Sequence, residues 1–145
     1  DPVPQMLELS PIDDRVVALG ETMPFGDETF DAVFSAYVFR NLDSVEHTMT
    51  EIARLLRPGG RAGIVDLARP KNRFLAVLHR IGSGIVLPIA GLIIGARDEY
   101  TYLHRSLDKL PPPEQMFAGG PLTLESVWRM GPFGFAYGVV LSKPA

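Results

Sequence analysis

The chain has 145 residues, 46% of them apolar and 21% charged, so it is long enough to bury one core and has the composition of a globular domain. Its formal net charge of −3 and the lack of a Lys/Arg cluster argue against a nucleic-acid partner. Cysteine is absent, which excludes disulfides, a thiolate nucleophile and cysteine-based metal sites.

The first 28 residues contain one predicted strand. Residues 1–15 have room for at most two helical turns between a proline-rich start and a polar turn. The β-branched run Val16-Val17-Ala18-Leu19 predicts a short buried strand, and residues 20–28 form a loop marked by Pro24 and Gly26. No basic-then-apolar leader is visible, so we expect a cytoplasmic setting.

Residues 29–70 contain a predicted strand, helix and second strand. Residues 30–35 predict the first strand, and Asp43 or Ser44 is the expected N-cap of the following helix. Apolar residues then recur at helical spacing, and Pro58-Gly59-Gly60 predicts the end of that helix. Residues 62–67 predict the next strand, whose nearly continuous apolar character favours cover on both faces.

The second half of the chain is predicted to be helical and to end in a hairpin. The apolar run 81–94 is shorter than the roughly 20 residues that span a bilayer, and Pro88 within it predicts a broken helix or a helical hairpin. The other predicted elements are helices over 72–80, over 100–110 and from 114, and strands over 126–130 and 137–142. Strands that alternate with helices before a final hairpin predict an α/β sheet with an antiparallel edge pair.

Residues at the ends of the predicted strands are the candidates for a site, because ligands of open α/β sheets bind beyond the carboxyl ends of the strands. Arg40-Asn41 is the leading pair, since a guanidinium and a planar amide before a helix are suited to the polar edge of a ligand. An exposed Arg40 and an Asn41 that only caps the helix fit the spacing equally well. Asp66 ends the next strand, where a turn or cap carboxylate is the commoner interpretation.

The remaining polar candidates lie in the helical half. The three histidines lack the spacing of metal ligands, so no metal site is predicted. Tyr100, Tyr102 and His104 follow two acidic residues and are able to supply a proton-handling group, although such a histidine is more often plain surface.

Several motifs along the chain carry a family resemblance. They are Met23-Pro24-Phe25, Arg40-Asn41, Leu56-Arg57-Pro58-Gly59-Gly60, Pro70-Lys71-Asn72, Val86-Leu87-Pro88, the stretch 100–106 and Tyr137-Gly138-Val139-Val140-Leu141. Together they resemble the class I S-adenosylmethionine-dependent methyltransferases, and within them the ubiquinone/menaquinone-biosynthesis C-methyltransferase family. The Leu-Arg-Pro-Gly-Gly element marks only the superfamily, whereas Arg40-Asn41 and the four motifs from Pro70 onward are more specific.

The resemblance implies a Rossmann-like methyltransferase sheet with an antiparallel C-terminal edge strand, incomplete at the N-terminus. Family members carry an earlier strand whose turn, an acidic residue and then Gly-x-Gly, cradles the methionine end of the cofactor, and no stretch here matches it. We therefore expect residues 1–145 to form a single truncated methyltransferase domain, with residues 72–120 as a helical insertion on the substrate side. The strand over 30–35 would then have an unpaired edge.

The resemblance also implies which residues contact the cofactor, S-adenosylmethionine. Asp1 would hold the ribose hydroxyls, and Gly20 and Glu21 would offer backbone groups to the adenine. Ser35 and Ala36 would lie under the cofactor.

The acceptor side is assigned in the same way. Arg40 would stabilise a phenolate, Asn41 would orient the ring and Tyr100 would close the substrate side. Residues 81–94 would accommodate a polyprenyl tail or contact a membrane surface, and the second role would make the protein peripheral to the membrane. A helical lid packed on the domain is the alternative for that segment.

The function implied is C-methylation of a prenylated quinol or naphthoquinol precursor in ubiquinone or menaquinone biosynthesis. Two alternatives stay open. One is a methyltransferase that acts on another small or lipid-like acceptor, and the other is an inactive remnant that binds a lipid or a protein.

Overall fold

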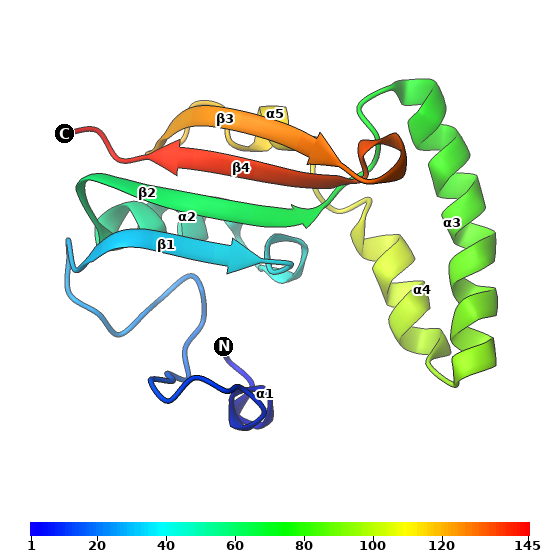
Figure 1. The fold of residues 1–145 in the computed structure, drawn as a ribbon, viewed down its shortest axis with the longest axis horizontal. Coiled ribbons are helices and arrows are strands. Elements are labelled where there is room, and N and C mark those ends of the chain that lie inside the picture. The colour runs from blue at the N-terminus through cyan, green and yellow to red at the C-terminus, as the bar shows by residue number, and fades with distance from the viewer.

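The computed structural model describes residues 1–145, apart from the side chain of Pro132 (Figure 1). In chain order the elements are α1 (Pro4–Glu8), β1 (Phe30–Ala36), the 3-10 turn η1 (Phe39–Asn41), α2 (Val45–Leu55), β2 (Leu56–Leu67), α3 (Arg73–Ile94), α4 (Arg97–Ser106), α5 (Pro113–Met116), β3 (Thr123–Met130), the 3-10 turn η2 (Pro132–Gly134) and β4 (Ala136–Ser142).

The four strands form one sheet in the order β1-β2-β4-β3. β1 and β2 are parallel, and β4 pairs antiparallel with both β2 and β3. The α/β class and the antiparallel pair at one edge are therefore as the sequence predicts. The last strand does not form that edge, because β4 lies inside the sheet and β3 is outermost.

One face of the sheet carries the core. Side chains at alternate positions of β2 and β4 point to the same side and are buried, among them Ala62, Ile64, Val139 and Leu141. They pack against the apolar face of α2, whose N-terminus is capped by the Ser44 hydroxyl, which accepts a hydrogen bond from the His47 N–H at 3.2 Å. Figure 1 shows α2 and α5 on that side of the sheet.

The opposite face of the sheet is largely open, which differs from the two-sided cover expected for β2. Phe34 on β1 is 71% exposed, and Trp128 on β3 is 42% exposed. Positions that alternate with the buried ones along β2, such as Gly63 and Val65, are only half-buried. The cause is that α2 and α5 pack on the same side.

The strand predicted over residues 16–19 does not form. Val16 and Val17 are exposed, and the local pairing is a single bridge between Leu19 and Thr22. A strand is stable only when a neighbour accepts its backbone hydrogen bonds, and no strand of the sheet pairs with this segment, which faces β1 across a cavity (Figure 1). The β-branched composition alone was therefore misleading.

The Pro-Gly-Gly element also lies elsewhere than predicted. α2 ends at Leu55, and Pro58-Gly59-Gly60 belongs to the start of β2. The pairing of β2 with β1 jumps from Phe30–Leu56 to Ala32–Arg61, so the intervening residues bulge from the ladder. Gly59 has φ +77°, and its N–H donates to the Lys143 carbonyl at 3.0 Å, which ties the bulge to the end of the chain.

The apolar run is one continuous helix rather than a broken one. α3 begins at Arg73, where the Asn72 side chain accepts hydrogen bonds from two backbone N–H groups, and it continues through Pro88 to a left-handed cap at Gly95. Gly91 allows the first turn of α4 to approach α3, since an added Cβ would lie 2.8 Å from the Arg97 Cα. By length and composition alone α3 is able to cross a membrane, which is weak evidence for a membrane role.

The loop before β1 is fixed to α2 by a carboxylate. Glu51 accepts two hydrogen bonds from Arg54, at 2.8 and 2.7 Å, and one from the Met23 N–H at 2.7 Å. The bonds from Arg54 are the main reason why the pKa of Glu51 falls from 4.5 to about 2.

We predict that Glu51→Gln flattens the acid dependence of stability. The Glu51 carboxylate binds a proton near pH 4.5 in the unfolded chain and only near pH 2 in the folded chain. The contribution of Glu51 to stability is therefore complete above pH 4.5 and is lost as the pH falls to 2. Thermal unfolding between pH 2 and 6 measures this. A wild-type curve and a variant curve that fall in parallel would contradict the prediction.

Candidate active site

The carboxyl ends of β1 and β2 hold a buried cluster of three polar side chains. Arg40, on η1, places its Nε 3.7 Å from Oδ1 of Asp66, whose side chain is fully buried. Tyr137 is 1% exposed and is the register partner of Asp66 on β4. Only 15% of the Arg40 side chain is exposed, so Arg40 is not the solvent-exposed residue that its spacing in the sequence also allowed.

The polar atoms of this cluster are only partly satisfied. Oδ1 of Asp66 accepts from the Leu67 N–H at 2.7 Å, but Oδ2 has no partner among the described side chains and backbone. Within the described residues, Nε and Nη1 of Arg40 and the Tyr137 hydroxyl also have no hydrogen-bond partner. Burial and the neighbouring Asp66 carboxylate raise the pKa of Tyr137, so this phenol keeps its proton at neutral pH.

The turn after β1 directs Arg40 and Asn41 over the strand ends. Tyr37 has φ +60°, an uncommon conformation for a residue with a side chain, and its N–H donates to the Val65 carbonyl at 2.8 Å. The chain turns at Tyr37, and η1 begins two residues later at Phe39. Backbone strain of this kind is concentrated at functional sites, which supports the choice of this edge of the sheet.

Asn41 is linked to the helical half by a tyrosine. Its Oδ1 accepts from the Tyr102 hydroxyl at 2.8 Å, and its Nδ2 lies 3.4 Å from the Tyr37 carbonyl, to which it donates. Tyr100, the residue assigned to the substrate side from the sequence, lies beside Gly91 at the far end of the α3–α4 pair. The structure thus brings Tyr102 rather than Tyr100 to Asn41.

The five residues assigned to the cofactor line two adjoining cavities beside β1. Asp1 and Gly20 line both, Ser35 lines one of about 370 Å³, and Glu21 and Ala36 line the other, of about 400 Å³. The Glu21 carboxylate is already engaged, because it accepts from the Asp43 N–H at 3.1 Å and from the Ser44 N–H at 3.4 Å. Both bonds are to Oε1, which is therefore already satisfied by the start of α2.

A second polar cluster, which the sequence did not indicate, centres on Arg69. Its guanidinium donates to both carboxylate oxygens of Asp108, at 2.9 and 3.3 Å, to the Ser83 hydroxyl at 2.8 Å and to the His104 carbonyl at 3.0 Å. The Nδ1 of His79 lies 3.2 Å from Nη1. These residues are up to 39 positions apart in the chain, so spacing gave no signal.

The signal for Asp66, in contrast, was present in the sequence. It has the same parity along β2 as the buried Ala62 and Ile64, so period-two alternation alone places its carboxylate on the core side. A carboxylate buried there requires a cation, and Arg40 is the one supplied.

The fold is that of solved S-adenosylmethionine-dependent methyltransferases. The Haloferax volcanii complex between the Trm112 methyltransferase activator and a candidate methyltransferase matches with a TM-score of 0.69 and 16% identity, covering 100% of this chain and 70% of that one. A methyltransferase from Aquifex aeolicus matches with a TM-score of 0.53 and 17% identity, over 95% and 58% of the two chains. At these identities the likeness concerns the fold alone.

Relatives of closer sequence define the family. Demethylmenaquinone methyltransferases from Protochlamydia amoebophila and Symbiobacterium thermophilum are 34% and 38% identical over 70% and 74% of this chain. A 2-phytyl-1,4-naphtoquinone methyltransferase from Nostoc punctiforme is 36% identical over 61%. The chain spans less than half of the length of these relatives, 42%, 46% and 39% respectively. Residues 11–119 match the ubiE/COQ5 methyltransferase family, and the chain belongs to it.

The Arg40–Asp66 pair leads to a stability prediction. Asp66→Ala would leave the buried Arg40 cation without its carboxylate, and breaking a buried pair from one side costs about 3–5 kcal/mol of unfolding free energy. Urea denaturation measures this loss. Asp31→Ala, which breaks the exposed pair between Asp31 and Arg57, is the matched control and should leave the midpoint unchanged. Equal effects of the two substitutions would refute a structural role of the buried pair.

Proposed function

We propose that this chain supports S-adenosylmethionine-dependent C-methylation of a prenylated quinol of the demethylmenaquinol type. Family membership and the names of the relatives support the reaction and the acceptor class. The observation that carries the proposal is the position of Arg40. It is a largely buried cation at the carboxyl ends of the parallel strands, paired with Asp66, and its Nε and Nη1 have no hydrogen-bond partner among the described residues.

The residues beside β1 fit the adenosine part of the cofactor. Asp1 offers a carboxylate at the cavity wall, with Oδ1 accepting from the Val3 N–H at 2.8 Å, and Pro2, Leu19 and Val38 form an apolar wall shared by both cavities. A carboxylate is suited to two ribose hydroxyls and an apolar wall to the flat faces of adenine. When bound, S-adenosylmethionine supplies an electrophilic methyl group.

The acceptor side needs a donor that stabilises negative charge on a ring oxygen. A ring carbon becomes nucleophilic as the neighbouring hydroxyl loses its proton, so a preorganised cation at that oxygen lowers the barrier. Arg40 has this charge, and Asp66 holds its guanidinium in place. Asn41, fixed by the Tyr102 hydroxyl, would orient the ring from the other side of the mouth.

A non-catalytic role is the competing proposal. The open face of the sheet, with exposed Phe34 and Trp128, would serve a module that binds a lipid or a protein. An acceptor other than a quinol, small or lipid-like, is the other alternative. Activity assays separate these possibilities: a non-catalytic module transfers no methyl group, and an enzyme with another acceptor leaves the quinol unmethylated.

We predict that Arg40→Ala lowers kcat for methylation of a demethylmenaquinol in the whole protein by at least about 10²- to 10³-fold, because a transition-state donor is removed. Transfer of labelled methyl groups measures the rate, and calorimetry should show unchanged S-adenosylmethionine affinity. Arg61→Ala, at an exposed arginine of β2, is the control with wild-type activity. Wild-type turnover by Arg40→Ala would refute the role of Arg40.

We predict weak or absent S-adenosylmethionine binding by the 145-residue chain on its own. The cavities beside β1 supply groups for the adenosine part, whereas the sequence contains no acidic Gly-x-Gly turn for the methionine end. Isothermal titration calorimetry is the direct measurement. Micromolar affinity would show that the turn is dispensable.

A further inference from the structure

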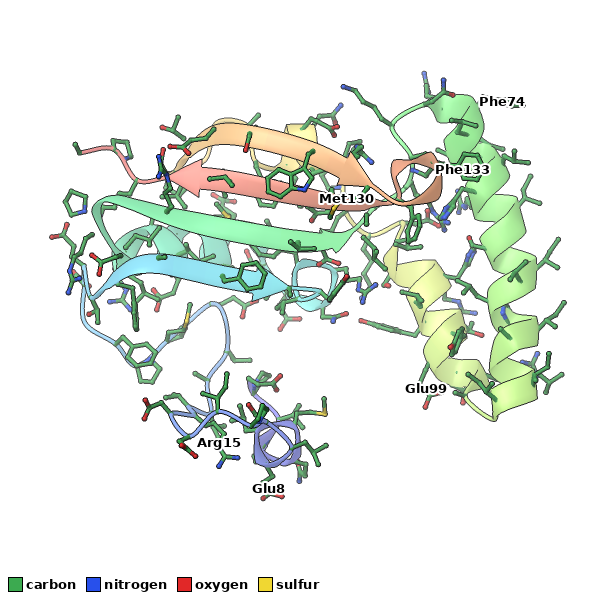
Figure 2. All side chains as sticks on the ribbon, viewed as in Figure 1. Glu8, Arg15, Phe74, Glu99, Met130 and Phe133 are labelled. Atoms are coloured by element: carbon green, nitrogen blue, oxygen red, sulfur yellow. The ribbon has the colours of Figure 1, made fainter. Side chains whose placement is uncertain are left out.

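A further cavity lies between α3, α4 and the β3–β4 turn, away from the cofactor residues. Its volume is about 490 Å³, within the range of small-molecule pockets. The wall is almost entirely apolar and includes Leu67, Leu78, Val86, Leu103, Phe133 and Phe135. Figure 2 shows Phe133 on the turn between β3 and β4, beside α3. We refer to this cavity as the hairpin chamber.

The two polar side chains on the wall of the hairpin chamber, Ser83 and His79, are fixed by contacts with neighbouring residues. Ser83 accepts from Arg69 at 2.8 Å and lies 3.0 Å from Nδ1 of His104, while the His79 ring stacks on Phe135 with 5.8 Å between centroids. Burial, with the nearby charge of Arg69 and His104, lowers the pKa of His79, so its ring is neutral at pH 7. The chamber therefore offers neutral, apolar surroundings to an occupant.

The hairpin chamber and the acceptor site use neighbouring residues of the same two elements, β2 and α4. Asp66 and Leu67 are consecutive on β2, and Asp66 faces Arg40 while Leu67 lines the chamber. On α4, the Tyr102 hydroxyl donates to Asn41 while Leu103 lines the chamber. At the end of β2 and on α4, one residue thus belongs to the polar site for a ring and the next to the wall of the apolar space, and on β2 the two side chains point to opposite faces of the sheet.

The chamber also opens on an apolar surface. Val86 and Phe133 line it and are 61% and 63% exposed. Further large apolar side chains continue along the outer face of α3, including Ile85, Ile89 and Ile93. A long hydrocarbon chain held in the chamber would therefore leave along apolar surface rather than into water.

We propose that the hairpin chamber is the subsite for the isoprenoid tail of the acceptor. This inference rests on the proposed function, because the acceptor class supplies the tail. It adds the location of the tail and the residues that hold it. Burial of a hydrocarbon chain against these walls supplies affinity without contact to the reacting ring.

The test is direct binding of a tail without a ring. A dansyl-labelled farnesol is titrated into the 145-residue chain with no S-adenosylmethionine present, and fluorescence reports saturable binding with one site. Gly82 lines the chamber and an added Cβ would meet no atom within 4 Å, so Gly82→Leu fills the space and also favours the helix. We expect Gly82→Leu to weaken binding by at least about tenfold, or about 1.4 kcal/mol.

Three comparisons make the test specific. Gly120→Leu adds the same side chain at a glycine outside the chamber where the new Cβ also meets no atom, and it should bind like wild type. Phe133→Ala removes an exposed part of the wall without a core change and should weaken binding several-fold. A dansyl-labelled dodecanol should bind less tightly than the farnesol, since it lacks the methyl branches of the isoprenoid.

The outcomes decide the proposal independently of methyl transfer. No saturable binding, or equal affinity of wild type and Gly82→Leu, would overturn it, and the second result would place the probe outside the chamber. Equal binding of dodecanol would overturn the isoprenoid assignment. Because cofactor and turnover are absent from the assay, a failure of the proposed reaction leaves this result intact, and the converse also holds.

Discussion

The alternation of side chains along β2 is the constraint on which the other features depend. β2 is hydrogen-bonded to β1 on one side and to β4 on the other, so it cannot slip by one residue without exposing its buried set. The same alternation sends Asp66 to the core face and Leu67 to the other. Arg69, two residues later, holds α3 and α4. One strand end therefore fixes the charged site, the chamber and the attachment of the helices.

The buried charges at this strand end are better understood as positioning than as stabilisation. Removing two charges from water is costly, and a pair separated by 3.7 Å recovers only part of that cost. An apolar pair of similar volume would satisfy the fold equally well. The arrangement is explained if the guanidinium must be held, dry and in a fixed orientation, beside a ring oxygen that becomes charged.

The sequence was informative where local chemistry decides structure. Ser44, one of the two expected caps, and the strand over 30–35 are confirmed, because a cap or an apolar run has a local cause. The strand over 16–19 failed because it needs a partner strand. Pro88 predicted a break because propensity omits the packing of α3 on α4, which keeps the helix continuous.

Long-range contacts limited what could be said about the site. Which of Tyr100 and Tyr102 contacts Asn41 depends on how α4 is rotated relative to η1. The sequence does not give this rotation, because both residues are tyrosines on the same helix. The Arg69 cluster joins β2 to both long helices and has no motif. Asp66 is different: the sequence favoured a turn or cap carboxylate, although the parity of Asp66 with Ala62 and Ile64 along β2 carries the signal for its burial.

The unpaired edge of β1 has a practical consequence for work in solution. β1 is outermost in the sheet, and Phe34 exposes an aromatic ring beside that edge. A free strand edge with an apolar flank is a template for the addition of another strand, from a second copy or from any extended peptide. Protein concentration therefore becomes an experimental variable, and dilute samples with early checks of particle size are the appropriate starting point for every titration.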